Sequence, residues 1–498
     1  MKLTHIYRFV LALMSAFYSC MAYSQELSIN WNADAFVAAG SADRLPFWAV
    51  SGKHGIIPES SAGLVQAGFG LRYTTADSLL VETAADFAGG LIQGGHKGLV
   101  PYGIVDRLYL STGWRMLRMD IGMRPRKNEL GPLSLTGGNV AWTGNARNLP
   151  GVDLRSDWIW LGRSRIFGVR GNIAHYQPFD DRYVSGMMIH DKSLEMKFRI
   201  AGCVEVSGGL EHIVQWGGFS PSEGRQPSAF KDFVAVFFAA RGDEDAHPSD
   251  QLNVLGNHLG REYLRIRWIH DAFDMTFQYD KPYEDGSSSR LQNIPDGVWT
   301  LKFSMSDRNA LITDVLYELA STTWQSGPVH DRPATEEEMS KQDPEDPYYG
   351  RVVIGGCDSY FNNGIYRSGW TYYGRVIGLP LIGGVEFNSD GIPVRLLNNR
   401  VRAHHVGVAG NISGVPYRFK GTYSRNYGCY GQGSDSFYNA VPWQLSLGLE
   451  ACVSRKVTRL PVDIHIGAYS DLGQLYPDSY GLTFRVSYSG TWMSSRSR

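Results

Sequence analysis

The sequence has few charged residues and almost no excess of either sign. Of its 498 residues, 19% are Asp, Glu, Lys or Arg, and the formal net charge is −1. Soluble domains average roughly 25% charged residues. A nucleic-acid-binding protein would carry a basic excess, and an acidic disordered chain a negative one. The composition argues against both, and we expect no nucleic-acid partner.

Cysteine is also scarce, and its spacing excludes several metal and redox sites. Apart from Cys20, the cysteines are Cys203, Cys357, Cys429 and Cys452, which are far apart in the sequence. No C-x-x-C pair occurs, which argues against a zinc ribbon or a thioredoxin-like site. Two interpretations stay open: a disulfide between Cys429 and Cys452 on neighbouring strands, or isolated small apolar residues.

The short motifs of common enzymes are missing. There is no phosphate-binding G-x-x-x-x-G-K-[ST], no H-E-x-x-H and no G-x-S-x-G. The adjacent pair His404 and His405 would point to opposite faces of a strand, so the two rings do not readily share a metal. We therefore expect no enzyme and no cofactor. A hydrolase whose Ser and His come from distant strands is a weaker alternative.

Long apolar runs are absent beyond the first residues. Lys2 and Arg8 precede the apolar run 9–18, and Ala22-Tyr23-Ser24 offers small residues at a cleavage site. This order predicts a signal peptide over residues 1–24 with cleavage before Gln25. A lipoprotein modified at Cys20 is the alternative. No later run approaches the roughly 18 apolar residues of a transmembrane helix, so the exported chain is either soluble or a membrane β-barrel.

What the sequence does contain is alternation of apolar and polar residues, the pattern of a strand with two different faces. In Leu194–Ile200, four apolar residues alternate with Glu195, Lys197 and Arg199. Other clear segments are Phe273–Asp280, Trp299–Ser306, Leu445–Ala451 and Leu482–Tyr488. Weaker ones are Leu64–Tyr73, Leu79–Phe87, Leu117–Met123, Trp158–Val169, Glu262–His270, Thr313–Ala320, Tyr417–Ser424 and Val462–Ala468.

Three features favour a membrane barrel over a soluble sandwich. Charges in the middle of strands suit a wet lumen. The last alternating segment ends in aromatics, which resembles the signal read by the barrel-insertion machinery, with Trp492 in the position of the usual terminal aromatic. Aromatic residues near strand ends suit interfacial girdles in outer-membrane lipid; these are Tyr73, Tyr109, Trp114, Tyr279, Trp299, Tyr488 and Trp492.

The length predicts a wide barrel. At roughly 25 residues per strand with its connections, the chain makes about 16–20 antiparallel strands. A lumen of that width needs loops to fill it. The segments that do not alternate are candidates: Lys127–Asp157, Trp216–Phe230, Arg241–Gly260, Lys281–Gly297 and Gln325–Tyr348.

One short helix is expected in the last of these segments. Thr335-Glu336-Glu337-Glu338 matches a capping box, which predicts a helix near Thr335–Gln342. The three carboxylates fit stabilisation of the helix dipole, with a calcium site as the minor alternative.

The chain resembles the Wzi-type capsule assembly proteins, in the branch typical of Bacteroides and its relatives. The matching stretches are Leu45–Trp48, Trp142–Pro150, Glu211–Gly218, Asn253–Gly260, Tyr283–Ser287, Pro295–Trp299, Asp358–Gly364, Asn398–Val401 and Tyr423–Gly428. The resemblance implies one outer-membrane β-barrel domain over residues 25–498, of about 18 strands, with occluding loops, little helix and an N-terminal periplasmic or plug segment. It further implies a lectin that holds capsular polysaccharide at the cell surface without catalysis.

Loops rich in Asn and aromatic residues supply candidates for glycan contact. Aromatic faces pack on sugar rings, while amides and guanidinium groups bind hydroxyl and acidic groups. The alternative is that the Asn residues only build turns. A porin-like channel, suggested by the charges in the strands, is the alternative function. The candidate binding residues are Tyr360, Asn362, Asn363, Trp370, Asn398, Asn399, Arg400, Arg425, Asn426 and Tyr427.

Overall fold

The computed structural model describes residues 26–75, 78–243, 247, 254–284, 291–345 and 348–495. The expected signal peptide lies outside the described residues. The first strand begins at Glu26, one residue after the expected cleavage site. Among the described residues, the first segment that enters the barrel interior is 41–61, which follows this strand.

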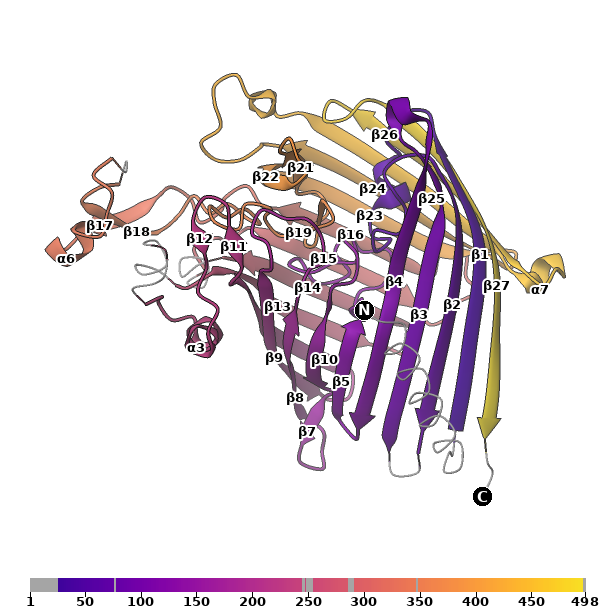
Figure 1. The fold of residues 1–498 in the computed structure, drawn as a ribbon. Helices are drawn as coiled ribbons and strands as arrows, with labels where there is room; N and C mark the ends of the chain where they lie inside the picture. Colours follow the sequence, from indigo (N-terminus) through magenta and orange to yellow (C-terminus); the bar gives the residue numbers. More distant parts are fainter. Residues whose placement is uncertain are drawn as a thin grey trace, which may run out of the picture.

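The alternating segments form one large antiparallel sheet (Figure 1). Its strands are β1 (Glu26–Gly40), β2 (Ala62–Thr74), β3 (Leu79–Gln93), β4 (Leu99–Trp114), β5 (Leu117–Met123), β6 (Pro150–Ser156), β7 (Ile159–Leu161), β8 (Phe167–Tyr176), β9 (Met188–Ile200), β10 (Val204–Trp216), β13 (Asn257–Ile269), β14 (Phe273–Tyr283), β15 (Gly297–Met305), β16 (Asp314–Ser321), β23 (Val401–Ile412), β24 (Val415–Asn426), β25 (Trp443–Val453), β26 (Asp463–Gly473) and β27 (Ser479–Ser495).

The sheet closes on itself as an 18-stranded barrel. β1 pairs with β27 from Glu26–Ser495 to Gly40–Gly481, which joins the two ends of the sheet. β6 and β7 both pair with β8 and together act as one interrupted strand. The expected single strand Trp158–Val169 is wrong: it is the hairpin of β7 and β8, turning where Gly162 has a φ of +77°.

Side chains alternate between the outer and inner faces as the sequence predicts. On β9, Leu194, Met196 and Phe198 are exposed on the outside, while Glu195 and Lys197 form ion pairs inside. One expectation about the aromatic girdle is wrong. β4 carries an extra residue opposite Asp86 and Phe87. Such a bulge reverses the alternation beyond it, so Tyr109 faces the lumen.

The two ends of the barrel differ in their connections. One end, here called the turn end, has short links and one small helix, α7 (Arg455–Thr458). The other, the loop end, has long links that carry α2 (Phe47–Val50), η1 (Gly95–Lys97), β11 (Phe219–Ser220), β12 (Gly224–Arg225), α3 (Phe230–Phe238), β17 (His330–Pro333), α6 (Glu336–Met339), β18 (Arg351–Gly355), β19 (Thr371–Tyr372), β20 (Arg375–Val376), β21 (Gly383–Phe387), β22 (Pro393–Asn398) and η2 (Phe437–Ala440).

Three of these links fold into the barrel as a plug, formed by residues 41–61, 124–149 and 356–400. Its apolar residues form one buried cluster with inward-facing residues of the wall. Trp48, Trp142 and Trp370 lie in this cluster. Hydrogen bonds tie the plug to the wall: Trp48 Nε1 donates to Thr422 Oγ1 at 3.2 Å, and Ser134 Oγ donates to Glu318 Oε1 at 2.6 Å. Among the described parts of the expected filling segments, Lys127–Asp157 contributes residues to the buried cluster of the plug, up to the start of β6.

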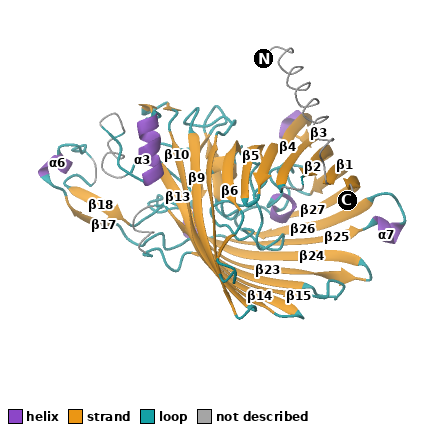
Figure 2. Cartoon of the chain, turned by 90° about the horizontal axis from the view of Figure 1, so that it is seen from below, coloured by secondary structure: helices purple, strands orange, loops and turns teal. Residues whose placement is uncertain are grey.

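The described part of the link between β10 and β13 lies outside the barrel wall, so Trp216–Phe230 does not fill the lumen as expected, nor do the described parts of Arg241–Gly260. Its helix α3 lies beside β9 and β10 in both views (Figures 1 and 2). The Phe233 ring packs on outward-facing His190 and Trp216, with centroids 5.3 and 5.7 Å apart. None of the described helices is long and apolar enough to cross a membrane.

The expectation that Gln325–Tyr348 fills the lumen is also wrong. β17, β18 and α6 project away from the barrel at the left of Figure 1. The predicted capping box is confirmed: Thr335 Oγ1 accepts from Glu338 N at 3.2 Å, and Glu338 Oε2 accepts from Thr335 N at 2.9 Å. Arg332 pairs with Glu338 as well. Among the described residues, no group of three or more potential metal ligands gathers here or elsewhere.

A candidate binding recess at the loop end

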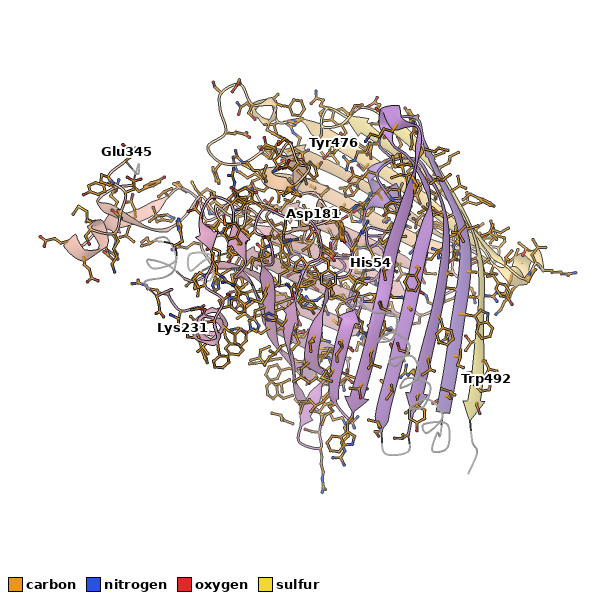
Figure 3. All side chains as sticks on the ribbon, in the orientation of Figure 1. His54, Asp181, Lys231, Glu345, Tyr476 and Trp492 are labelled. Atoms are coloured by element: carbon orange, nitrogen blue, oxygen red, sulfur yellow. The ribbon has the colours of Figure 1, made fainter. Side chains whose placement is uncertain are left out.

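A cavity of about 590 Å³ lies at the loop end, between the plug and the upper parts of β24 and β25. We call it the recess. Figure 3 places Tyr476 at this end of the barrel and His54 deeper inside. The polar and aromatic residues that line the recess include Arg44, Glu59, Tyr102, Asn145, Arg147, Tyr373, Arg375, Gln444 and Tyr476.

Two links of the plug carry the central guanidinium groups. Arg147 comes from the link after β5 and Arg375 from β20, and hydrogen bonds join these links. Asn145 Nδ2 donates to Val376 O at 2.9 Å, and Thr143 N donates to Ile377 O at 2.8 Å. One bond joins backbone to backbone and the other joins the Asn145 side chain to backbone, and together they hold the two arginine-bearing segments next to each other.

Neither of these arginines forms an ion pair with a carboxylate within the described part of the chain. Arg147 donates to Tyr102 Oη at 3.3 Å, and its guanidinium lies 4.0 Å from the centroid of the Tyr373 ring. Arg375 donates to the carbonyl oxygen of Ile57 at 2.7 Å. Both side chains keep further N–H groups, since a guanidinium has five.

A third arginine completes the cationic lining. Arg44 lies over the Tyr476 ring at 4.2 Å and pairs with Glu59 at 3.4 Å. Burial alone would lower the pKa of Arg44, but Tyr476 and Glu59 outweigh burial and raise it. Burial lowers the pKa of Arg375, Glu59 and Tyr102 raise it, and Arg44 and Arg147 lower it, so that the pKa lies below its ordinary value. The three guanidinium groups therefore repel one another, with Glu59 as the carboxylate in the lining of the recess.

The wall of the recess also contains a polar group without a partner. Gln444 is 4% exposed, and its Oε1 accepts from Tyr476 N at 3.1 Å. Its Nε2 is buried and has no hydrogen-bond partner within the described residues. A buried amide donor without an acceptor costs free energy, so such a group needs an explanation.

Deeper in the barrel, the wall from β3 to β14 is lined by ion pairs. Arg126 reaches both Asp191 and Glu211, and Arg261 pairs with Glu211 at 3.0 Å and with Asp280 at 3.2 Å. Trp142 of the plug lies 3.9 Å from the Arg126 guanidinium, measured from the ring centroid. The charges expected in the lumen are therefore neutralised by neighbours and packed against the plug.

A second large cavity, of about 630 Å³, opens toward the turn end. Its charged lining includes Lys302, Arg308, Arg418 and Arg485. Plug residues such as Leu133 form part of its lining. The plug therefore lies between this cavity and the recess.

Several residues expected to bind glycan are buried inside the protein. Tyr360, Trp370 and Asn399 are 0% exposed, and Asn398 is 2% exposed. Trp370 donates to Ala141 O at 2.6 Å within the plug. Because no surface of these side chains is accessible, we assign them to the packing of the plug and not to a binding site.

The other expected residues mostly stabilise loops. Asn362 Nδ2 donates to Leu396 O at 3.0 Å, and Asn363 Oδ1 accepts from Ile365 N at 2.9 Å. Arg400 donates to Thr323 O at 3.1 Å. Hydrogen bonds of this kind are expected if the residues build turns, which was the alternative to glycan binding.

Three expected residues remain near the loop-end ends of strands. Arg425 is exposed on β24, next to exposed outward-facing Tyr423, and Tyr427 is half-buried in the following link. Asn426 lines the recess but is 1% exposed, and its amide donates to Pro442 O at 3.1 Å. Of the ten expected residues, Asn426 alone is part of the lining of the recess.

Sequence reasoning missed the arginines and tyrosines of the recess. Arg147 lies within the stretch Trp142–Pro150 that carries the family resemblance, but Arg44, Tyr373, Arg375 and Tyr476 come from three other links. Nothing in their spacing brings them together. Their proximity arises from the folding of the plug.

The four cysteines among the described residues are free. Cys429 is buried, and its thiol lies 3.2 Å from Leu396 O. The structure thus supports isolated cysteines over a Cys429–Cys452 disulfide.

The closed 18-stranded antiparallel barrel with an apolar outer face defines an outer-membrane β-barrel protein. In such proteins the long loops are extracellular and the short turns periplasmic. The recess therefore faces the cell exterior.

The chain is similar to several solved structures. Wzi of Escherichia coli, described as an outer-membrane protein involved in group 1 capsule assembly and a carbohydrate-binding β-barrel, superimposes with a TM-score of 0.51 at 12% identity, covering 96% of this chain and 87% of Wzi. OprD of Pseudomonas aeruginosa matches at 0.45 and 9% identity, covering 94% and 96%, and OpdK at 0.47 and 10%, covering 94% and 100%. No protein-family model and no curated protein matches the sequence.

Proposed function

We propose that this outer-membrane barrel binds capsular polysaccharide and holds it at the cell surface without catalysing a reaction. The observation that carries the proposal is the combination of a plugged lumen and an outward-facing recess. The apolar plug occupies the middle of the barrel, and the recess presents three arginines and three tyrosines to the exterior. Aromatic faces and guanidinium groups are suited to sugar rings and their polar substituents.

Wzi supports the proposal as a carbohydrate-binding barrel of the same fold. The sequence motifs that resemble Wzi-type proteins also support it. Trp142–Pro150 contributes both to the plug and, through Asn145 and Arg147, to the recess.

Deletion of the gene tests the proposal. We expect the deletion strain to release capsular polymer into the medium while total synthesis is unchanged, and the wild-type gene to restore cell-bound polymer. Cell-bound polymer that stays at the wild-type level would contradict an anchoring role.

A porin-like channel is the second candidate. The cationic lining of the turn-end cavity favours it, since charged lumens attract ions and solutes. Planar-bilayer recording separates the two functions. A plugged barrel gives no stable open conductance, whereas a channel gives discrete open levels from the wild-type protein.

A further inference from the structure

Three guanidinium groups share the recess with a single lining carboxylate. Glu59 pairs with Arg44 and its charge also acts on Arg375, but neither Arg147 nor Arg375 forms an ion pair of its own among the described residues. Holding unpaired cations together in a half-buried site costs free energy, because each raises the energy of the others. Such an arrangement is stabilised when an anion binds.

The buried amide of Gln444 points to the same conclusion by a separate route. Gln444 lines the recess, and its buried Nε2 lacks an acceptor among the described residues. A ligand oxygen at that position would satisfy the donor. The missing acceptor and the unpaired cations lie in one cavity, so a single ligand can supply both an acceptor and a negative charge.

The aromatic lining of the recess indicates an organic ligand rather than a simple anion. Tyr373, which is 46% exposed, and Tyr476 each have one ring face against an arginine. Phe387 is also exposed, at 52%, and lines the recess. A cavity of about 590 Å³ accommodates a small organic ligand and not merely an ion.

We propose that the recess binds a carboxylate-bearing sugar of an acidic surface polysaccharide, with Arg147 and Arg375 on the carboxylate, Gln444 Nε2 on a ring or hydroxyl oxygen, and Tyr373 beside the sugar ring. The inference rests on the proposed function and specifies its ligand. A planar guanidinium and a carboxylate form paired charge-assisted hydrogen bonds, which gives both strength and orientation.

The test uses the full chain in detergent micelles and the surface polysaccharide purified from the cells that make this protein. The polymer is used in its native form and after chemical reduction of its carboxylates to alcohols. We expect the native polymer to bind and the reduced polymer to bind about tenfold or more weakly, since a charge-assisted contact is lost. The affinity for native polymer should fall as salt is raised.

Two substitutions locate the contact. Arg147→Gln should weaken binding of the native polymer about tenfold and leave binding of the reduced polymer unchanged, while Arg147→Lys should recover part of the loss. Arg375 also donates to Ile57 O, so Arg375→Gln can disturb the fold as well as the binding contact. A loss of binding in Arg375→Gln therefore counts only if its heat-modifiable gel mobility is that of the wild type. Arg163→Gln, in the exposed turn between β7 and β8 at the opposite end, is the matched control.

The outcomes separate this inference from the proposed function. Equal binding of native and reduced polymer, or native-polymer binding that Arg147→Gln leaves intact, overturns the acidic-sugar site while the anchoring function stands. Absence of binding to either polymer by the folded wild-type protein, together with normal cell-bound capsule in the deletion strain, overturns both. Binding that follows phosphate-bearing outer-membrane glycolipid and not the polymer also overturns the inference.

Discussion

The indole of Trp370 lies edge-on to the indole of Trp142, with ring centroids 5.5 Å apart at an interplanar angle of 80°. Trp370 Nε1 also donates to Ala141 O at 2.6 Å. Because Trp142 and Trp370 belong to different links, this contact joins two of the three parts of the plug. The plug is therefore one packed unit and not a set of independent loops.

Truncation of Trp370 should loosen this unit. A buried Trp→Ala substitution costs about 3–5 kcal/mol, through lost burial and a cavity. We expect Trp370→Ala to produce flickering conductance in planar bilayers, while the wild-type protein stays closed. Trp324→Ala is the control, because Trp324 is 45% exposed in a loop-end link outside the plug cluster. A silent Trp370→Ala barrel with an unchanged unfolding temperature would contradict the role given to this residue.

Arg126 of the plug should contribute strongly to stability through its ion pairs with the wall strands β9 and β10. It pairs with Asp191 and Glu211, which are 0% and 5% exposed. Removing one partner from a buried ion pair costs about 3–5 kcal/mol, because the remaining charge stays buried. We expect Arg126→Met to lower the temperature at which the barrel loses its heat-modifiable gel mobility.

The neighbouring Lys127 offers a matched control for that substitution. Its side chain is 77% exposed and pairs with Glu129 at 3.6 Å, and surface pairs contribute about 0–1 kcal/mol. Lys127→Met should therefore leave the transition unchanged. Equal effects of the two substitutions would show that the burial of Asp191 and Glu211, the partners of Arg126, is not the cause.

The plug should lose stability in mild acid because of His54. Burial and the nearby Arg107 lower the pKa of His54 below its ordinary 6.5, while a hydrogen bond with Asn148 acts in the opposite direction. The lowered folded-state pKa means that His54 contributes its full stabilisation above pH 6.5. That contribution is lost as the pH falls below 6.5 toward the folded-state pKa, because the loosened plug takes up the proton more readily.

Conductance at pH 7.5 and pH 5 measures this effect. We expect plug opening to increase at pH 5 in the wild-type protein and the increase to shrink in His54→Gln. His270→Gln, at an exposed position in the turn between β13 and β14, should keep the full pH response. A pH response that His54→Gln leaves undiminished would assign the titration to another group.

The absence of a side chain at Gly448 on β25 should be required for Trp48 to pack against the barrel wall. A Cβ at this position would lie 2.9 Å from Trp48 Cβ, closer than carbon atoms normally approach. Adding a methyl group to a packed core costs about 1–3 kcal/mol. We expect Gly448→Ala to lower the unfolding temperature and to increase protease cleavage of residues 41–61. Gly103→Ala on β4, where a Cβ meets nothing within 4 Å, should do neither.

Much of the barrel wall could be predicted from the sequence, because successive side chains of a strand alternate between the outer face and the lumen. This alternation gives the sequence an apolar–polar period of two residues. The pairs formed by Leu194 and Glu195, or Phe277 and Gln278, have one side chain on the outer face and one inside. Tyr109 shows the limit of this rule. The bulge opposite Asp86 and Phe87 leaves no mark in the local pattern, because one extra residue in β4 is defined only by its pairing with β3.

The lack of alternation in a link did not predict whether that link lies inside or outside the barrel. Gln325–Tyr348 and residues 356–400 both lack it, yet the first projects away from the barrel and the second fills it. The difference lies in which surface each segment meets. Residues 356–400 carry Tyr360, Phe361 and Trp370 into an apolar cluster whose other members come from distant parts of the chain.

The sequence by itself determined the membrane barrel, its strand number to within about two, and the capped helix α6, because these depend on residues adjacent or two to four positions apart. Only the tertiary structure decided that the lumen is plugged and that Arg44, Arg147 and Arg375 share one recess. Those arginines lie on three links separated by up to hundreds of residues, and only packing of the plug against the closed wall brings their charges together.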